Sequence, residues 1–199
     1  MSEVAPLLGV LAGVLGAADT VPYVRDTLAG RTRPYRWTWL IWAVLAVVVC
    51  ASQRADGASW SLVMAAVQAV LTSVIFALAI RRGEGALGVG ERVMLAVAAG
   101  GVLGWLIADE PVVATVCVVA ADLIGTAMML PKTYRDPDSE TLATFALASV
   151  AGALAAGAVG RLDASLLLYP IYFCVANAAI ALLITSRRAR APAAFRPTP

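Results

Sequence analysis

Long apolar runs separated by short polar connections are the dominant pattern of this chain. Each run approaches the roughly 20 apolar residues that a helix needs to cross the hydrocarbon core of a bilayer. The pattern therefore predicts seven membrane-spanning helices. Their expected positions are residues 4–28, 37–53, 59–80, 92–108, 111–131, 141–159 and 164–186. Because the connections are brief, we expect neighbouring helices to pack together in one bundle.

The composition agrees with an all-α polytopic membrane protein. Of 199 residues, 61% are hydrophobic and only 14% are charged, with a mean hydropathy of +0.83. A soluble domain carries roughly 25% charged residues. The chain has no histidine, and its three cysteines (Cys50, Cys117 and Cys174) are isolated within apolar runs. We therefore expect no disulfide framework, no metal site and no cofactor.

The basic residues lie almost entirely on one side of the predicted bundle. With the N-terminus outside, thirteen fall inside and two, Arg54 and Arg161, fall outside. The inner set comprises Arg25, Arg31, Arg33, Arg36, Arg81, Arg82, Arg92, Lys132, Arg135, Arg187, Arg188, Arg190 and Arg196. Cytoplasmic loops carry an excess of Lys and Arg. We therefore expect an inner-membrane protein with a cytoplasmic C-terminus. Because these arginines lie at the membrane surface, we expect membrane lipid as a partner and no nucleic acid.

Three pairs of residues share one spacing of 109 positions: Pro22 with Pro131, Gln68 with Asn177, and Trp60 with Tyr169. This spacing suggests that the first three helices are duplicated as the last three, although chance similarity between apolar segments is the alternative. An odd fourth helix between them would make the two repeats parallel. The expected units are a first repeat (1–82), a linker helix (83–109), a second repeat (110–186) and a basic tail (187–199).

The 3+1+3 layout, the proline before each basic loop and the segment "RWTWLIW" (residues 36–42) resemble the SWEET and PQ-loop superfamily of transporters. Pro22–Tyr23 and Pro131–Lys132 stand where members carry Pro–Gln. The resemblance implies solute transport by alternating access, with Pro22 and Pro131 as hinges. It also implies a solute-binding role for Asn177. The alternatives are a passive kink at Pro22 and a simple helix end at Pro131.

Two carboxyl groups, Asp19 and Asp122, lie well inside predicted spans. A charge at this depth costs at least about 2.5–3.5 kcal/mol and normally faces the bundle interior or a water-filled path. Both residues are therefore candidates for proton coupling, and Asp122 is also a candidate for solute binding. A static hydrogen bond, or an ion pair with Arg25 or another inner arginine, would equally explain Asp19. A satisfied buried carboxyl would explain Asp122.

Gln68 and Asn177 are the candidate amide pair of a solute pocket, with Tyr172 lining the same path. Facing amides near the midplane offer donors and acceptors to a small polar solute. Their alternative role is interhelical hydrogen bonding, worth about 0.6 kcal/mol.

The remaining polar and aromatic groups near the inner boundary have simpler explanations. Trp37, Trp39 and Trp42 are expected to be interfacial anchors. The charged cluster formed by Arg135, Asp136, Asp138 and Glu140 is interpreted as solvated surface charge, with a gate latch as the alternative.

The sequence thus predicts an alternating-access transporter of a small polar solute such as a sugar, amino acid or vitamin, with proton coupling as an option. A non-transporting receptor or accessory subunit of the same fold is the alternative. We do not expect an enzyme, because no nucleophile–base pair or metal-ligand set is present. Homo-oligomerisation is left open.

Overall fold

The computed structural model describes residues 4–55, 60–107, 111–160, 162 and 164–190. Within these ranges the fold is all-α, as predicted. The helices are α1 (Val4–Ala18), α2 (Thr20–Leu28), α3 (Arg36–Ala55), α4 (Trp60–Arg82), α5 (Val89–Ile107), α6 (Pro111–Arg135), the 3-10 helix η1 (Pro137–Ser139), α7 (Leu142–Ala158) and α8 (Ala164–Arg190). The side chains of Arg54 and Trp60, and residues Arg161 and Arg196, lie outside the described part.

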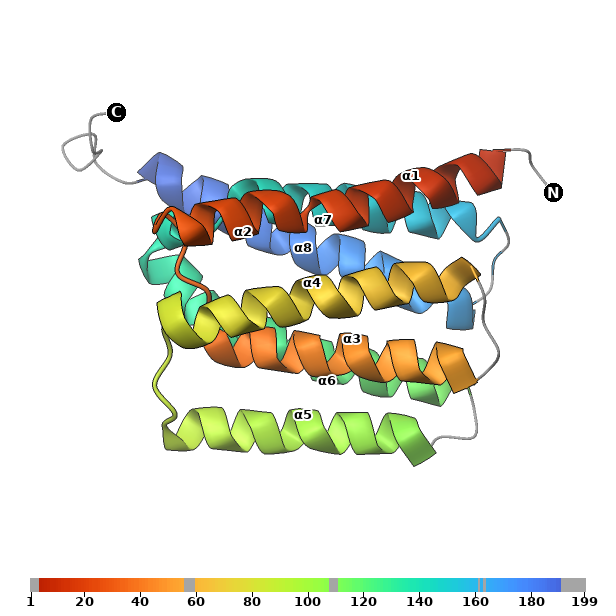
Figure 1. The fold of residues 1–199 in the computed structure, drawn as a ribbon, viewed down its shortest axis with the longest axis horizontal. Coiled ribbons are helices and arrows are strands. Elements are labelled where there is room, and N and C mark those ends of the chain that lie inside the picture. Colours follow the sequence, from red (N-terminus) through yellow and green to blue (C-terminus); the bar gives the residue numbers. More distant parts are fainter. Residues whose placement is uncertain (1–3, 56–59, 108–110, 161, 163, 191–199) are drawn as a thin grey trace.

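The first predicted span is present as two consecutive helices, α1 and α2. The break falls at Asp19, one turn before Pro22, where the sequence placed the kink. Pro22 has no N–H to donate to the carbonyl of Ala18, and its ring crowds that carbonyl. Asp19 nevertheless keeps helical dihedrals (φ −61°, ψ −30°), so the two helices continue in nearly one direction (Figure 1).

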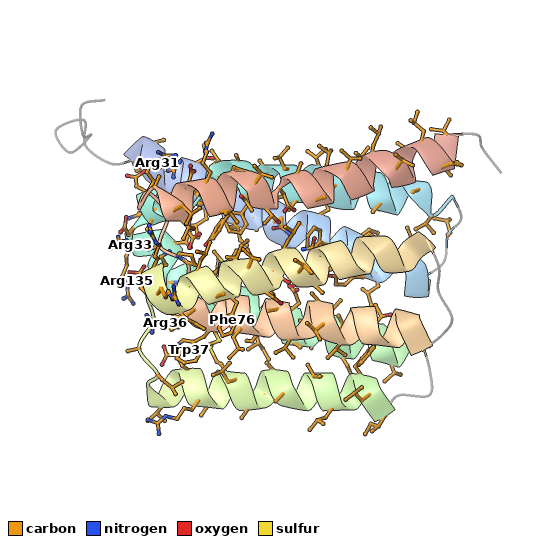
Figure 2. The ribbon with its side chains drawn as sticks, viewed as in Figure 1. Arg31, Arg33, Arg36, Trp37, Phe76 and Arg135 are labelled. Atoms are coloured by element: carbon orange, nitrogen blue, oxygen red, sulfur yellow. The ribbon has the colours of Figure 1, made fainter. Side chains whose placement is uncertain are left out.

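The helices lie side by side along one long axis, and α1 begins at the end of the bundle opposite to the one where α8 finishes (Figure 1). Arg31, Arg33, Arg36 and Arg135 gather at the end where α8 finishes (Figure 2). We call this the charged end. The α2–α3 turn lies here, and Gly30 in this turn has φ +74°, a left-handed conformation that glycine adopts without strain.

Four described helical segments are long and apolar enough to cross a membrane: Val4–Leu28, Val89–Ile107, Thr115–Arg135 and Leu167–Arg190. Two shorter segments, Arg36–Val48 and Leu142–Ala158, are also apolar. Many large apolar side chains on these helices are exposed, as a lipid-facing surface requires. The protein is therefore an integral membrane protein with several candidate spans.

The helices on the two sides of α5 pack in the same pattern. α1 packs along α7, and α6 packs on α3, whereas α3 pairs with α4 and α7 pairs with α8. α5 lies at the edge of the bundle, mainly against α6 (Figure 1). Two buried apolar clusters result. One includes Tyr23, Trp39, Ile75, Phe145 and Ile184 near the charged end, and the other centres on Ile41, Leu45 and Ala121.

Candidate functional site

Asp122 and Tyr172 form a hydrogen bond in the interior of the bundle. Asp122 lies near the middle of α6 and is only 9% exposed. Tyr172 of α8 donates its hydroxyl to Asp122 Oδ2 at 2.7 Å. We call these two residues the central pair. The sequence identified both as solute-binding candidates, and the fold brings them into direct contact.

A third helix, α3, closes over the central pair. Thr38 of α3 donates its hydroxyl to the Gly125 carbonyl at 2.6 Å. A Cβ atom on Gly125 would lie 3.2 Å from Trp42 Nε1, so glycine is what lets α3 approach α6 this closely. The Trp42 N–H is buried without a hydrogen-bond partner and lies within interaction range of the Asp122 carboxyl. The Trp42 N–H and the Thr126 hydroxyl therefore lie beside the Asp122 carboxyl.

No basic residue pairs with Asp122 among the described residues, in contrast to Asp26, which pairs with Arg25 and Arg31. A buried carboxylate without a counter-ion is costly at this depth unless a proton or a cationic group neutralises it. The Tyr172 hydroxyl supplies one neutral hydrogen bond and no charge. The central pair therefore has an electrostatic reason to bind a proton or a polar solute.

The two candidate amides lie on α4 and α8. Asn177 is 9% exposed and donates from Nδ2 to the Phe173 carbonyl, one turn earlier in its own helix, at 2.8 Å. Gln68 is half-buried, and its backbone carbonyl accepts a hydrogen bond from Thr72. Among the described residues, no hydrogen bond joins the two amides. Asn177 lies five positions beyond Tyr172 on α8, and α4 makes no backbone contact with α8 in the described part of the chain.

Asp19 has neighbours different from those of Asp122. It is 6% exposed, and Thr20 donates to its Oδ1 at 3.0 Å. Thr144 of α7 donates to the Asp19 backbone carbonyl at 2.7 Å. The ion pair considered between Asp19 and Arg25 is not formed, because Arg25 pairs with Asp26 at 3.3 Å. Asp19 is therefore held at the α1–α2 break against α7, and the fold does not join it to Asp122.

The two candidate hinges differ in their surroundings. Pro22 is half-buried in α2, just after the break at Asp19. Pro131 is exposed and lies inside α6, which continues to Arg135. The alternative that α6 simply ends at Pro131 is therefore wrong, because the helix continues for one more turn. Both prolines remove a backbone hydrogen bond close to the charged end.

Glu140 forms a buried polar cluster that sequence reasoning missed. Only 1% of Glu140 is exposed, so its interpretation as solvated surface charge is wrong. Lys132 Nζ donates to Glu140 Oε1 at 2.5 Å, and the Tyr23 hydroxyl donates to Oε2 at 2.8 Å. Trp39 Nε1 donates to the Tyr23 oxygen at 2.9 Å. We call these four residues the charged-end cluster.

Burial of the charged-end cluster raises the pKa of the Glu140 carboxyl above its ordinary value, although the nearby Lys132 charge opposes that rise. Trp39 is 5% exposed and packs against Tyr23, with ring centroids 4.7 Å apart and planes tilted by 52°, so it is a core residue and its prediction as an interfacial anchor is wrong. The signal that could have revealed the cluster is its spacing, since Tyr23 and Lys132 are also 109 positions apart.

Around this cluster, polar contacts join the α2–α3 turn to the α6–α7 connection. The Thr32 and Thr141 hydroxyls lie 2.5 Å apart, and Thr141 donates to Asp26 Oδ2 at 3.2 Å. Arg33 pairs with Asp136, and its carbonyl accepts from Lys132. The charged end is therefore tightly closed. Within the described part of the chain, no group of three or more His, Cys, Asp or Glu side chains could hold a metal ion.

Comparison of the chain with protein-family models, curated proteins and solved structures finds no match in any of the three. The functional argument therefore depends on the residues and their geometry.

Proposed function

We propose that this protein is an alternating-access transporter of a small polar solute, with the central pair at its binding site. The observation that carries the proposal is a buried carboxyl, near the middle of a candidate span where three helices meet, that has no counter-ion among the residues the structure describes. Intramembrane ionisable residues are costly to bury and normally mark a solute or ion pathway.

The packing supports a binding site between two halves. We define the first triplet as α1–α4, with α1 and α2 forming one span, and the second triplet as α6–α8. The second helix of each triplet packs on the first span of the other, α7 on α1 and α3 on α6. Both triplets start at the same end of the bundle (Figure 1). Such reciprocal packing is what an internal two-fold axis along the membrane normal would produce, with seven spans and α5 as the linker.

On this interpretation the central pair lies at the junction of the two triplets. Asp122 and Tyr172 belong to the second triplet, whereas Trp42 belongs to the first. Asn177 and Gln68 extend the site along α8 and α4. Asp122 carries a proton or neutralises a cationic group, and Asp19 is the second proton-coupling candidate. Pro22 and Pro131 bend as the two ends open in turn, with the charged end facing the cytoplasm.

The direct test is uptake by proteoliposomes, after a thermal-shift screen of sugars, amino acids and vitamins has identified a stabilising solute. Transport predicts accumulation or exchange of that solute by wild-type protein and its loss in Asp122→Asn. Leu123→Ala is a matched control, because Leu123 is the neighbouring α6 residue and is exposed on the apolar surface. A solute that binds with no flux would contradict the proposal and favour a receptor or accessory subunit.

A further inference from the structure

The charged-end cluster connects the two triplets through one carboxyl group. Glu140 precedes α7 and therefore moves with the second triplet, as does Lys132 of α6. Tyr23 of α2 and Trp39 of α3 belong to the first triplet. Glu140 thus accepts one bond from its own triplet, at 2.5 Å, and one from the other, at 2.8 Å.

The spacing of the contacts places the cluster close to the proposed two-fold axis. Thr32 and Thr141 are 109 positions apart and touch each other. Tyr23 and Lys132 share that spacing and meet on the same carboxyl group. Equivalent residues of two halves can touch only near the axis that relates them. The charged-end cluster therefore lies where the halves must part if this end opens.

We propose that Glu140 is a positioning residue that holds the charged end closed. This end opens by breaking the Tyr23–Glu140 hydrogen bond while the Lys132–Glu140 pair stays together. The inference rests on the proposed alternating access, because it assigns a buried contact between the triplets that such a motion must break, together with the contacts of Thr32, Asp26 and Arg33 at the same end.

The chemistry of the two bonds to Glu140 explains why the Tyr23 bond breaks while the Lys132 bond is kept. Separating a buried ion pair leaves uncompensated charges and is strongly unfavourable. Separating a neutral hydroxyl from a carboxylate that keeps its ammonium partner costs much less, and water can replace the hydroxyl. The cross-triplet bond is therefore strong enough to favour closure and weak enough to be reversible. The more exposed Arg33–Asp136 pair would part with it, at a cost reduced by solvent.

The first experiment measures access to the interior from the charged-end side. In a chain with Cys50, Cys117 and Cys174 replaced by alanine, Ala181→Cys places a thiol on α8 beside the buried cluster of Tyr23 and Ile184. A charged, membrane-impermeant thiol reagent is applied to each side of oriented vesicles. We expect Tyr23→Phe to increase labelling from the charged-end side by about ten- to a hundredfold, since a hydrogen bond to a charged group is lost.

Arg31→Gln is the matched control, because it removes an exposed ion pair with Asp26 at the same end. We expect it to change labelling by less than about fivefold. Labelling of Tyr23→Phe at the wild-type rate would overturn the inference. If wild-type protein takes up no solute but Tyr23→Phe still increases labelling, the role of Glu140 stands and the transport proposal fails. If wild-type protein takes up solute but Tyr23→Phe leaves labelling unchanged, the transport proposal stands and the role of Glu140 fails.

A second variant tests the same motion without removing the cluster. In the cysteine-free chain, Thr32→Cys with Thr141→Cys replaces two hydroxyls that lie 2.5 Å apart with thiols that start close to the S–S bonding distance. Oxidation should stop uptake by tethering the triplets at the charged end, and reduction should restore it. The reduced form controls for folding. Undiminished uptake by the oxidised, fully cross-linked protein would overturn the inference.

Discussion

Glu140 and Asp122 are both buried carboxyl groups, yet their surroundings differ in one decisive respect. Glu140 faces Lys132 at 2.5 Å and also accepts from Tyr23. Asp122 accepts from Tyr172, lies beside the unpaired Trp42 N–H, and has no basic partner among the described residues. The first group is electrostatically compensated by the fold, and the second is not.

The comparison suggests a division of labour. A compensated carboxyl positions helices, because its binding capacity is already used by the protein. An uncompensated carboxyl retains capacity for a proton or a solute, and its cost to folding is the kind that functional sites commonly carry. Substitutions at the charged-end cluster should therefore act mainly on stability and access. Substitutions at the central pair should act mainly on binding and uptake.

The largest effect is expected on breaking the ion pair of the charged-end cluster. Lys132→Met leaves Glu140 buried without its cation, and should lower the free energy of unfolding by about 3–5 kcal/mol. Chemical unfolding in detergent micelles measures this. Arg31→Met, which breaks an exposed pair, should cost less than about 1 kcal/mol. Equal costs for the two variants would show that Glu140 is not compensated in the way described.

Next in size is the effect of Asp122→Asn on uptake. Removing the acceptor charge should lower uptake by about ten- to a hundredfold, since hydrogen bonds to charged groups contribute about 1.5–3 kcal/mol. If Asp122 carries the coupled proton, the pH dependence of residual uptake should also disappear. Uptake at several pH values checks both results, with Asp19→Asn as the second carboxyl variant. Preserved pH dependence in Asp122→Asn alone would transfer the coupling role to Asp19.

Tyr172→Phe tests the same site more gently. It removes the hydroxyl that donates to Asp122 and keeps the aromatic ring. We expect an increase in the half-saturation constant for uptake of about fivefold, corresponding to about 1 kcal/mol. The free energy of unfolding should change little, because water or the solute can replace the donor. A large loss of stability with unchanged half-saturation would assign Tyr172 to packing.

The smallest effects are expected at the amides. Gln68→Ala and Asn177→Ala should each raise the half-saturation constant by about threefold, the equivalent of about 0.6 kcal/mol for an intramembrane hydrogen bond. Asn177 should have the larger effect, because it shares α8 with Tyr172. Measuring both in one uptake assay ranks them. A change in protein yield with normal uptake kinetics would indicate that the amides only join helices.

Several features were predictable from the sequence because they depend on local composition. The expected segment 59–80 is observed as α4 (Trp60–Arg82), and 141–159 as α7 (Leu142–Ala158). Pro22 likewise predicted a disturbed helix, although the break falls one turn earlier. The intramembrane position of Asp122 was also visible, since a charge within a long apolar run needs only that run to be recognised.

Other features required the tertiary structure. Glu140 follows a stretch of charged loop residues, which locally is typical of surface charge. Its burial depends on Tyr23, which is 117 positions away. Trp39 has the sequence position of an interfacial anchor, but its N–H donates to the buried hydroxyl of Tyr23.

By itself, the sequence determined that this chain is helical and apolar enough to reside in a membrane, and that a few polar groups lie within its spans. Hydrophobicity and backbone preference are summed along the chain, so these properties need no knowledge of partners. Only the tertiary structure decided which carboxyl has a counter-ion and which lacks one. Compensation of a buried charge depends on distances of a few ångströms between helices that are far apart in sequence.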